Sequence, residues 1–249
     1  MTWLVTTELE YAEEGSTMRR MLLAIMVLGS AQALMAQTVT SRVKPHVQPA
    51  ETLSVTDIPV PFFCAADGTV VLDAVVTETG EVQEVEVRRD ITCLTQLAVQ
   101  AVEDWKFSPA TLAGKAIASR MPVAVTFHPA TSAGMTITSG TPLALPALIL
   151  QSKAAIQAEL QPAEVTRAAL PKYPYNTFVA GSVTLEVSLN EKGEAEKVRV
   201  LRDLLPLTEE SKAVVGDWRF MPATFNGKPV QSKIVLAFVF RPPIVNNLP

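Results

Sequence analysis

The segment Trp105–Thr111 returns in nearly the same form as Trp218–Thr224, 113 positions further along the chain. More than a third of the aligned residues are identical at this offset, and no insertion or deletion is needed. Identical pairs include Pro61 with Pro174, Gly68 with Gly181, Gly80 with Gly193, and Phe127 with Phe240. A period of this length is too long for a solenoid repeat. The chain therefore holds two copies of one small domain, and its function must be one that such a duplicated module can perform.

Composition narrows the function classes. The 249 residues carry a formal charge of −4, and four glutamates lie within Met1–Thr17, so the rest of the chain is close to neutral. A neutral chain with interspersed charges lacks the basic surface that nucleic-acid binding requires. The sequence has two histidines and no phosphate-binding loop, nucleophile elbow or paired-acid motif. We expect a non-enzymatic protein with no metal, no cofactor and no nucleic-acid partner.

The N-terminal region has the pattern of an export signal. Arg19–Arg20 precede the uncharged and largely apolar stretch Met21–Ala36, which ends in small residues. Cleavage after Ala33 or Ala36 would release the protein into the periplasm. The stretch is short for a membrane helix, which needs about 20 apolar residues. The alternative is an uncleaved anchor in the inner membrane, in which case this segment alone contacts the membrane.

The first half of each copy predicts a β-hairpin. Gly68–Thr77 is rich in β-branched residues, Glu78–Gly80 forms a tight turn, and Glu81–Arg89 alternates apolar and polar side chains. The second copy repeats this pattern as Ser182–Leu189 and Glu194–Arg202.

The second half of each copy predicts a helix and a closing strand. Apolar residues then follow the spacing of one helix face, at Leu94, Leu97, Ala98, Ala101, Val102 and Trp105. Pro109 and Pro222 stop any helix beyond the tryptophans, and Ser119–Phe127 and Ser232–Phe240 predict closing strands. The fold class is α+β, with two β-β-α-β modules that each pack one helix on a three-stranded antiparallel sheet.

Trp105 and Trp218 lie where each helix gives way to extended chain. Together with Phe107 and Phe220, they could form a platform on which a ligand stacks. Each tryptophan also continues the apolar face of its helix, so we interpret both as core residues. His46 and His128 have no partner at metal-binding spacing and are interpreted as surface residues.

The module resembles the C-terminal domain of TonB, the energy transducer of the bacterial cell envelope. The resemblance rests on motifs that occur in one order and in both copies. In the second copy these are Tyr173-Pro174 before the first strand, Gly181, Gly193 in the hairpin turn, and Trp218, Phe220 and Pro222 after the helix. The first copy keeps Trp105, Phe107 and Pro109.

The resemblance implies a periplasmic domain that grips an extended segment of an outer-membrane TonB-dependent transporter or another envelope protein, in support of transport. A sheet edge can accept such a strand, and its main chain supplies the affinity. By analogy the receptive edge is the closing strand of each module. The expected residues are Lys233, Ile234, Val235, Leu236, Ala237 and Phe238, with counterparts Arg120, Met121 and Val123.

A second hypothesis is that the two modules pair their edges with each other and serve as a periplasmic scaffold without energy transduction. Residues Thr38–Pro59 would extend over some 70 Å at about 3.1–3.5 Å per residue, which is too short to cross a periplasm. Strand pairing between copies of the chain would give a homo-oligomer.

Cys64 and Cys93 are the two cysteines of the chain. Because the hairpin turns at Thr79–Gly80, pairing Val70 with about Arg89 places Cys64 near residue 95, within reach of Cys93. Export permits a disulfide between them.

The predicted organisation is a leader with signal or anchor at 1–36, a linker at 37–57, module 1 at 58–130, a linker with a possible helix (Ala147–Leu160) at 131–167, module 2 at 168–244 and a tail at 245–249.

Overall fold

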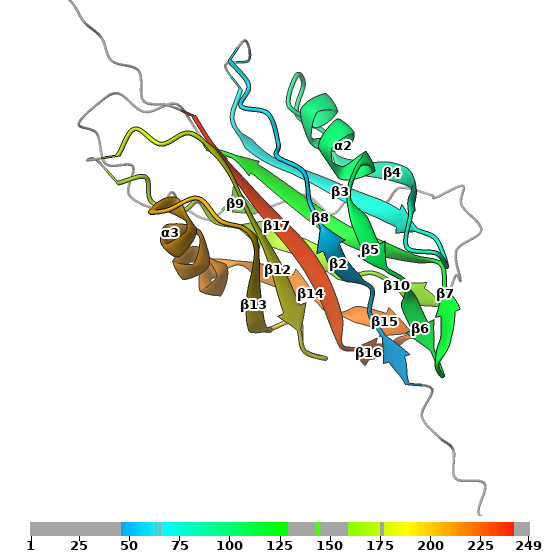
Figure 1. Ribbon diagram of the computed structural model, residues 1–249. Helices are drawn as coiled ribbons and strands as arrows, with labels where there is room; N and C mark the ends of the chain where they lie inside the picture. The colour runs from blue at the N-terminus through cyan, green and yellow to red at the C-terminus, as the bar shows by residue number, and fades with distance from the viewer. Residues whose placement is uncertain are drawn as a thin grey trace, which may run out of the picture. The chain divides into compact units, whose positions relative to one another are not determined.

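Figure 1 shows the computed structural model of the protein. It describes residues 46–62, 64, 66–128, 143–144, 159–174 and 177–241, all within one compact unit. The predicted signal, most of the predicted linker helix and the C-terminal tail lie outside these residues. No helix among the described residues is both long and apolar enough to cross a membrane.

Each module has the predicted β-β-α-β order. Module 1 is formed by β3 (Gly68–Val76), β4 (Val82–Arg89), α2 (Thr95–Glu103) and β8 (Ser119–Phe127). Module 2 repeats it as β12 (Gly181–Leu189), β13 (Ala195–Arg202), α3 (Leu207–Val214), which continues into the 3-10 helix η1 (Val215–Asp217), and β17 (Ser232–Phe240). The predicted α+β fold is confirmed.

Glycine at the hairpin turns is required by a close approach. Gly80 has φ +89° and Gly193 has φ +80°. A Cβ atom at Gly80 would lie 2.0 Å from the Phe107 carbonyl oxygen, and one at Gly193 would lie 2.4 Å from that of Phe220. Each hairpin turn is thus packed against the backbone of the strand that follows its tryptophan, which explains why both motifs recur together.

Short strands surround the main elements. After α2 come β5 (Lys106–Ser108), β6 (Ala110–Leu112) and β7 (Lys115–Ile117). After α3 come β14 (Arg219–Met221), β15 (Ala223–Phe225) and β16 (Lys228–Val230). Each module begins with two short strands, here called the arm. In module 1 the arm is β1 (Val47–Gln48) and β2 (Glu51–Ser54). In module 2 it is β10 (Leu160–Gln161) and β11 (Glu164–Ala168). The arms pair with the short strands, β1 with β6, β2 with β5, β10 with β15 and β11 with β14, while β9 (Leu143–Ala144) pairs with β11.

The arms correct the predicted linkers. Residues 47–54 and 160–167 were assigned to linkers, but β1, β2, β10 and most of β11 lie there. Their positions are again related by 113 residues, and Gln48–Glu51 repeats as Gln161–Glu164. The repeat therefore begins upstream of both predicted module boundaries, which were placed at residues 58 and 168.

The two modules share one six-stranded sheet in the order β13-β12-β17-β8-β3-β4. Neighbouring strands are antiparallel within each module, whereas β17 and β8 run parallel at the centre. The closing strands of the two modules thus lie side by side, as Figure 1 shows.

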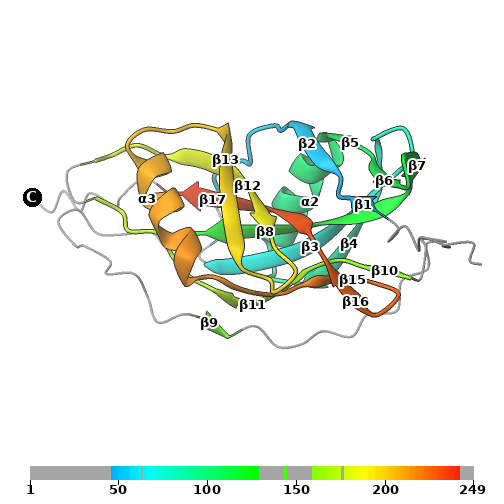
Figure 2. The same ribbon diagram turned by 90° about the horizontal axis from the view of Figure 1, so that it is seen from below.

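Register places the two helices on opposite faces of this sheet, because paired residues on neighbouring strands point to the same face. Leu72 pairs with Val123, which pairs with Val235, and these residues pack in the core that contains α2. On the other face Leu236 pairs with Ala124 and packs in the core that contains α3. Figure 2 shows the two helices on either side of the central strands. The modules are therefore related by a half-turn about an axis parallel to β8 and β17.

Both tryptophans are core residues, as interpreted from the sequence. Trp105 is 0% exposed and Trp218 is 2% exposed. His128, by contrast, was expected at the surface, and that expectation is wrong. Its Nε2 lies 3.0 Å from the Pro171 carbonyl oxygen, and its ring stacks on Phe240. Pro171, Tyr173 and Phe240 of the second half of the chain cover the end of β8, and this places the His128 ring in the interior.

The predicted Cys64–Cys93 disulfide is present, with the two Cα atoms 6.1 Å apart. It ties the segment before β3 to the segment between β4 and α2. Thr177 and Pro206 occupy the equivalent positions of module 2, so this cross-link belongs to module 1.

Candidate functional site

The closing strands, predicted as receptive edges, lie in the interior of the sheet. β17 pairs with β12 along its whole length and with β8 over Val235–Val239. β8 likewise lies between β3 and β17. The predicted residues Ile234, Val235, Leu236, Ala237, Phe238, Met121 and Val123 are at most 2% exposed. The assignment of these strands as edges is corrected, because each module covers the closing strand of the other.

The cause is visible in the apolar pattern of the closing strands. Ile234–Phe240 is an unbroken apolar run, and all seven residues are 0% exposed. A strand with one solvated face alternates apolar and polar residues, whereas a continuous run is typical of a strand covered on both faces. That signal points to a central strand.

The outer strands of the six-stranded sheet are β4 and β13. Each has one neighbour in this sheet, and each carries charged residues at alternating or adjacent positions. Their charged residues are Glu84, Glu86, Arg88 and Arg89 on β4, and Glu196, Lys197, Arg199 and Arg202 on β13. Val200 on β13 is 38% exposed. These two strands are the edges at which a strand could add to the main sheet.

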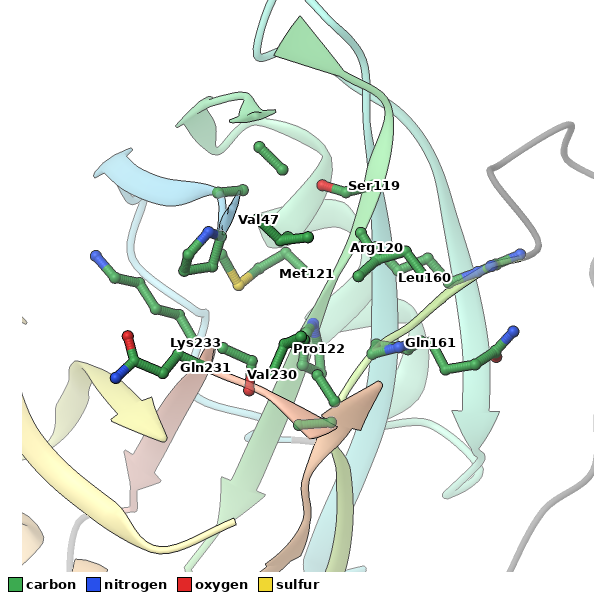
Figure 3. A pocket seen from close by; sticks show the side chains of 17 residues that line it. Val47, Ser119, Arg120, Met121, Pro122, Leu160, Gln161, Val230, Gln231 and Lys233 are labelled. Carbon is green, nitrogen blue, oxygen red and sulfur yellow. The ribbon is translucent and has the colours of Figure 1, made fainter. Parts of the chain in front are cut away.

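The contact between β8 and β17, here called the seam, is open at one end. Parallel pairing in the described chain begins at Val123 and Val235 and extends to Phe127 and Val239. Before this point the two strands remain paired with β3 and β12 but not with each other. A small pocket of about 40 Å³ lies where they separate, as Figure 3 shows.

The walls of this pocket, here called the axial pocket, come from equivalent positions of the two modules. Val47 faces the pocket with Leu160, and the predicted edge residues Arg120 and Lys233 also line it. Further equivalent pairs in the lining are Pro49 with Pro162, Ala50 with Ala163, Ala110 with Ala223, and Ser119 with Ser232. The pocket thus lies on the axis that relates the modules, and most of its lining is apolar.

A larger hollow of about 430 Å³ shares Pro49 and the segment 231–233 with the axial pocket. Here it is called the side hollow. It is lined by the arm, the strands after α2 and the ends of β12 and β13, with Glu51, Glu196 and Lys233 as its charged residues.

The arm of module 1 is held on module 2 by directed polar contacts at β12. Glu186 is 3% exposed and accepts hydrogen bonds from the Thr52 N–H (2.7 Å) and from Arg199 (2.9 Å). Arg199 also donates to the Thr52 carbonyl oxygen (2.7 Å), and Lys233 lies 3.2 Å from Glu186. Burial alone would raise the pKa of Glu186. The hydrogen-bond donors and cations lower it by more than burial raises it, so the pKa of Glu186 lies below its usual value.

Comparison with models of protein families matches the chain in two regions, residues 65–129 and 171–242. The matching model is described as Gram-negative bacterial TonB protein C-terminal. The two regions together cover more than half of the chain, and each contains one module. The chain belongs to this family. Neither the curated proteins nor the solved structures yielded a match.

The residues that carry the TonB C-terminal motif hold the fold together. Tyr173 is 3% exposed and donates a hydrogen bond to the Val179 carbonyl oxygen (2.9 Å). Gly181 opens β12 with φ +143°, and Pro222 lies at the short strands against the Gly193 turn. Pro109 lies in the same way against Gly80. Among the described residues no cluster of histidine, cysteine or acidic side chains could hold a metal ion.

Sequence reasoning missed the arms and the two hollows at the open end of the seam. The repeated tetrapeptide Gln48–Glu51 was an available signal for the arms. The hollows had no such signal, because they arise from pairing between the modules.

Proposed function

We propose that this member of the TonB C-terminal family is a non-enzymatic protein of the cell envelope that binds an extended segment of a partner by strand addition. The partner is an outer-membrane transporter or another envelope protein, and the binding supports transmembrane transport. The two modules act as one preassembled pair. A partner strand therefore adds at β4 or β13, and the closing strands hold the modules together.

The observation that carries this proposal is the parallel pairing of β8 with β17. It occupies the closing-strand edge of each module and leaves the other edges, β4 and β13, at the outside of the sheet. Main-chain groups on the outer side of such strands are available to a partner chain. An exported protein would meet envelope partners in the periplasm, and the signal-like stretch Met21–Ala36 supports that location.

A scaffold without a strand-binding role is the second candidate. Charged side chains on edge strands discourage strand addition, and β13 carries Glu196, Lys197, Arg199 and Arg202. In that case the paired modules would position other envelope proteins through their faces.

Affinity capture from envelope extract separates the two candidates. The purified protein is compared with Lys197→Pro and Val198→Pro variants in β13. Neighbouring residues of a strand point their N–H groups to opposite sides, so one of the two prolines leaves pairing with β12 intact. That variant is recognised by its unchanged melting temperature. The matched variants in β4 are Glu84→Pro and Val85→Pro.

We expect the protein to recover outer-membrane β-barrel transporters, and a folded proline variant in β13 or β4 to lose them. Equal recovery by folded proline variants of both strands would favour the scaffold.

A further inference from the structure

The two outer strands of the six-stranded sheet carry opposite charges at equivalent positions. Residues 84–87 of β4 read Glu-Val-Glu-Val, and residues 197–200 of β13, 113 positions later, read Lys-Val-Arg-Val. Figure 1 shows β4 and β13 on opposite sides of the sheet. One molecule thus has an acidic edge and a basic edge, and opposite charges on neighbouring strands attract each other.

Both segments are regular β-strand. Residues 84–87 pair one by one with β3, and residues 197–200 pair one by one with β12. A register shift lies on either side of each segment. Such irregularities end regular pairing at an edge. A further strand is therefore accepted at these two segments.

The inner pairing decides which way the side chains of each segment point. In β4 the two glutamates point away from the core that contains α2, and the two valines point toward it. In β13 the lysine and the arginine point away from the core that contains α3, and the two valines point toward it. Each edge therefore has a charged face opposite its own helix and a valine face on the side of that helix.

Two of the four charges are available to a second molecule. Glu84 and Lys197 are exposed, and their side chains have no ion pair or hydrogen bond among the described residues. Glu86 and Arg199 already form ion pairs within the chain, at 3.2 and 2.9 Å. A second molecule therefore gains most from Glu84 and Lys197.

A second copy of the chain fits these edges when it is turned over. β4 and β13 run in the same direction, because β8 and β17 are parallel and the other neighbouring strands are antiparallel. Rotation by a half-turn about an axis in the sheet plane, across the strands, reverses the strands and exchanges the two faces. The β13 strand of the turned copy then lies antiparallel to β4 of the first, with both charged faces on one side.

One register satisfies all these positions. Pairing Val85 with Val198 of the second copy places Glu84 opposite Arg199 and Glu86 opposite Lys197. The two valines occupy equivalent positions of the modules, so their main-chain groups have the same orientation toward the inner strands. The register therefore agrees with the alternation of hydrogen bonds in an antiparallel pair.

Pairing of like edges is disfavoured. Two β4 strands would place Glu84 of one copy opposite Glu86 of the other. Two β13 strands would likewise place Lys197 opposite Arg199. Like charges that lie directly opposite each other destabilise a strand pair, so an acidic edge selects a basic one.

We propose that β4 of one copy of this chain binds β13 of a second copy, so that the molecules assemble head to tail into a continuous sheet. Such a contact is heterologous and leaves one free edge at each end, so the assembly is open-ended. The contact is short and therefore weak, and assembly requires a high local concentration. It is independent of the proposed function, because the added strand belongs to a second copy and no envelope partner is needed.

Sedimentation equilibrium of the protein purified from the envelope tests the assembly. The weight-average mass should exceed that of one chain and rise with concentration up to about 1 mM protein at low salt. It should fall toward that of one chain when the salt concentration is raised to about 0.5 M, because salt screens charges at the surface.

Charge reversal at one edge identifies the strands. Glu84→Lys alters the β4 edge and Lys197→Glu alters the β13 edge. Both residues are exposed and lack side-chain partners among the described residues, so the melting temperature should not change. Each variant alone should associate about fivefold more weakly or worse. Lys115→Glu on β7, at an exposed lysine away from both edges, is the matched control and should associate normally.

A mixture of the two variants tests the head-to-tail arrangement. Glu84→Lys keeps an unaltered β13, and Lys197→Glu keeps an unaltered β4. These two edges can pair, whereas both outer edges of the resulting dimer carry a reversed charge. The equimolar mixture should therefore form dimers that do not grow at higher concentration.

Four results would overturn the inference. They are no association of the unaltered protein at about 1 mM, full association of either variant alone, equal weakening by Lys115→Glu, and a mixture no heavier than the separate variants. An absence of association would leave the proposed function standing, because affinity capture tests the strand of an envelope partner separately.

Discussion

Asp73 and Glu186 occupy equivalent positions of the two modules, and their pKa values are shifted in opposite directions. Both are buried, at 3% exposure each. Burial is the largest influence on Asp73 and raises its pKa from 3.8 to about 6, against the lowering effect of Arg88, whose Nε lies 2.9 Å from its carboxylate. Glu186 has the same exposed fraction but also receives the Thr52 N–H, Arg199 and Lys233. These three contacts, one from the arm and two from β13 and β17, lower the pKa of Glu186 below its usual value.

This difference predicts two separate pH windows of stability. Asp73 binds its proton more tightly in the folded protein than in the unfolded chain, so its contribution is present below pH 3.8 and is lost as the pH rises through about 6. The full change is about 3 kcal/mol. Urea unfolding between pH 4 and pH 6.5 should show this decline, and Asp73→Asn should flatten it. A variant with an unchanged decline would assign it to other groups.

Glu186 should act in the opposite sense. Its folded-state pKa lies below the usual 4.5, so its contribution is present at neutral pH and is lost as the pH falls through the folded-state value. Glu186→Gln should therefore reduce the loss of stability in acid below pH 4.5 and leave the window above it unchanged. Unfolding at pH 3 to 5 measures this, with Asp73→Asn as the comparison. The prediction fails if Glu186→Gln changes the slope above pH 5 instead.

The two core tryptophans offer a matched pair of substitutions. The Trp218 Nε1 donates a hydrogen bond to the Ala169 carbonyl oxygen (3.1 Å), whereas Trp105 Nε1 has no partner among the described residues. Replacing tryptophan by phenylalanine removes ring volume at both sites, but it removes a hydrogen bond only at Trp218. Trp218→Phe should lose about 1–2 kcal/mol more stability than Trp105→Phe. Urea denaturation of both variants gives the difference, and equal losses would mean that the hydrogen bond contributes nothing.

The fold of one module was predictable from sequence, because its signals are local. The turn at Gly80, the helical spacing of Leu94 to Trp105 and the stop at Pro109 each depend on neighbours within one copy. The Cys64–Cys93 disulfide followed from the hairpin register alone. The join between the modules depends on residues more than 100 positions apart, and no local pattern encodes a parallel β8–β17 pair.

For the closing strands, the analogy with the family and the apolar pattern of the sequence pointed to different positions in the sheet. Analogy with a single TonB C-terminal domain made Lys233–Phe238 an edge. The apolar run Ile234–Phe240 instead indicates burial on both faces, which a duplicated module achieves by covering itself. The axial pocket could not be predicted, because it exists only where β8 and β17 separate.

The disulfide should stabilise the whole sheet. Cys64→Ser or Cys93→Ser opens a loop with a sequence separation of 29 residues, and we expect the free energy of unfolding to fall by about 2–4 kcal/mol. Reducing agent should lower the stability of the unaltered protein equally and leave the serine variants unchanged. Thr177→Ser in module 2, at the position equivalent to Cys64, is the control. Unaltered stability after reduction would show that the cross-link is energetically neutral.

The last prediction concerns coupling between the modules. Val235 and Leu236 lie on β17 between two strands, so proline at either position removes a hydrogen bond to β8 or to β12 and should cost about 3 kcal/mol or more. Because the two cores pack against the same strand, we expect β3 and β12 to lose protection from hydrogen exchange together. Hydrogen exchange followed by mass spectrometry compares these variants with the proline variant of β13 that leaves the β12 pairing intact, which should disturb neither strand. If β3 keeps its protection while β12 loses it, the seam does not couple the modules, and they would unfold as separate domains.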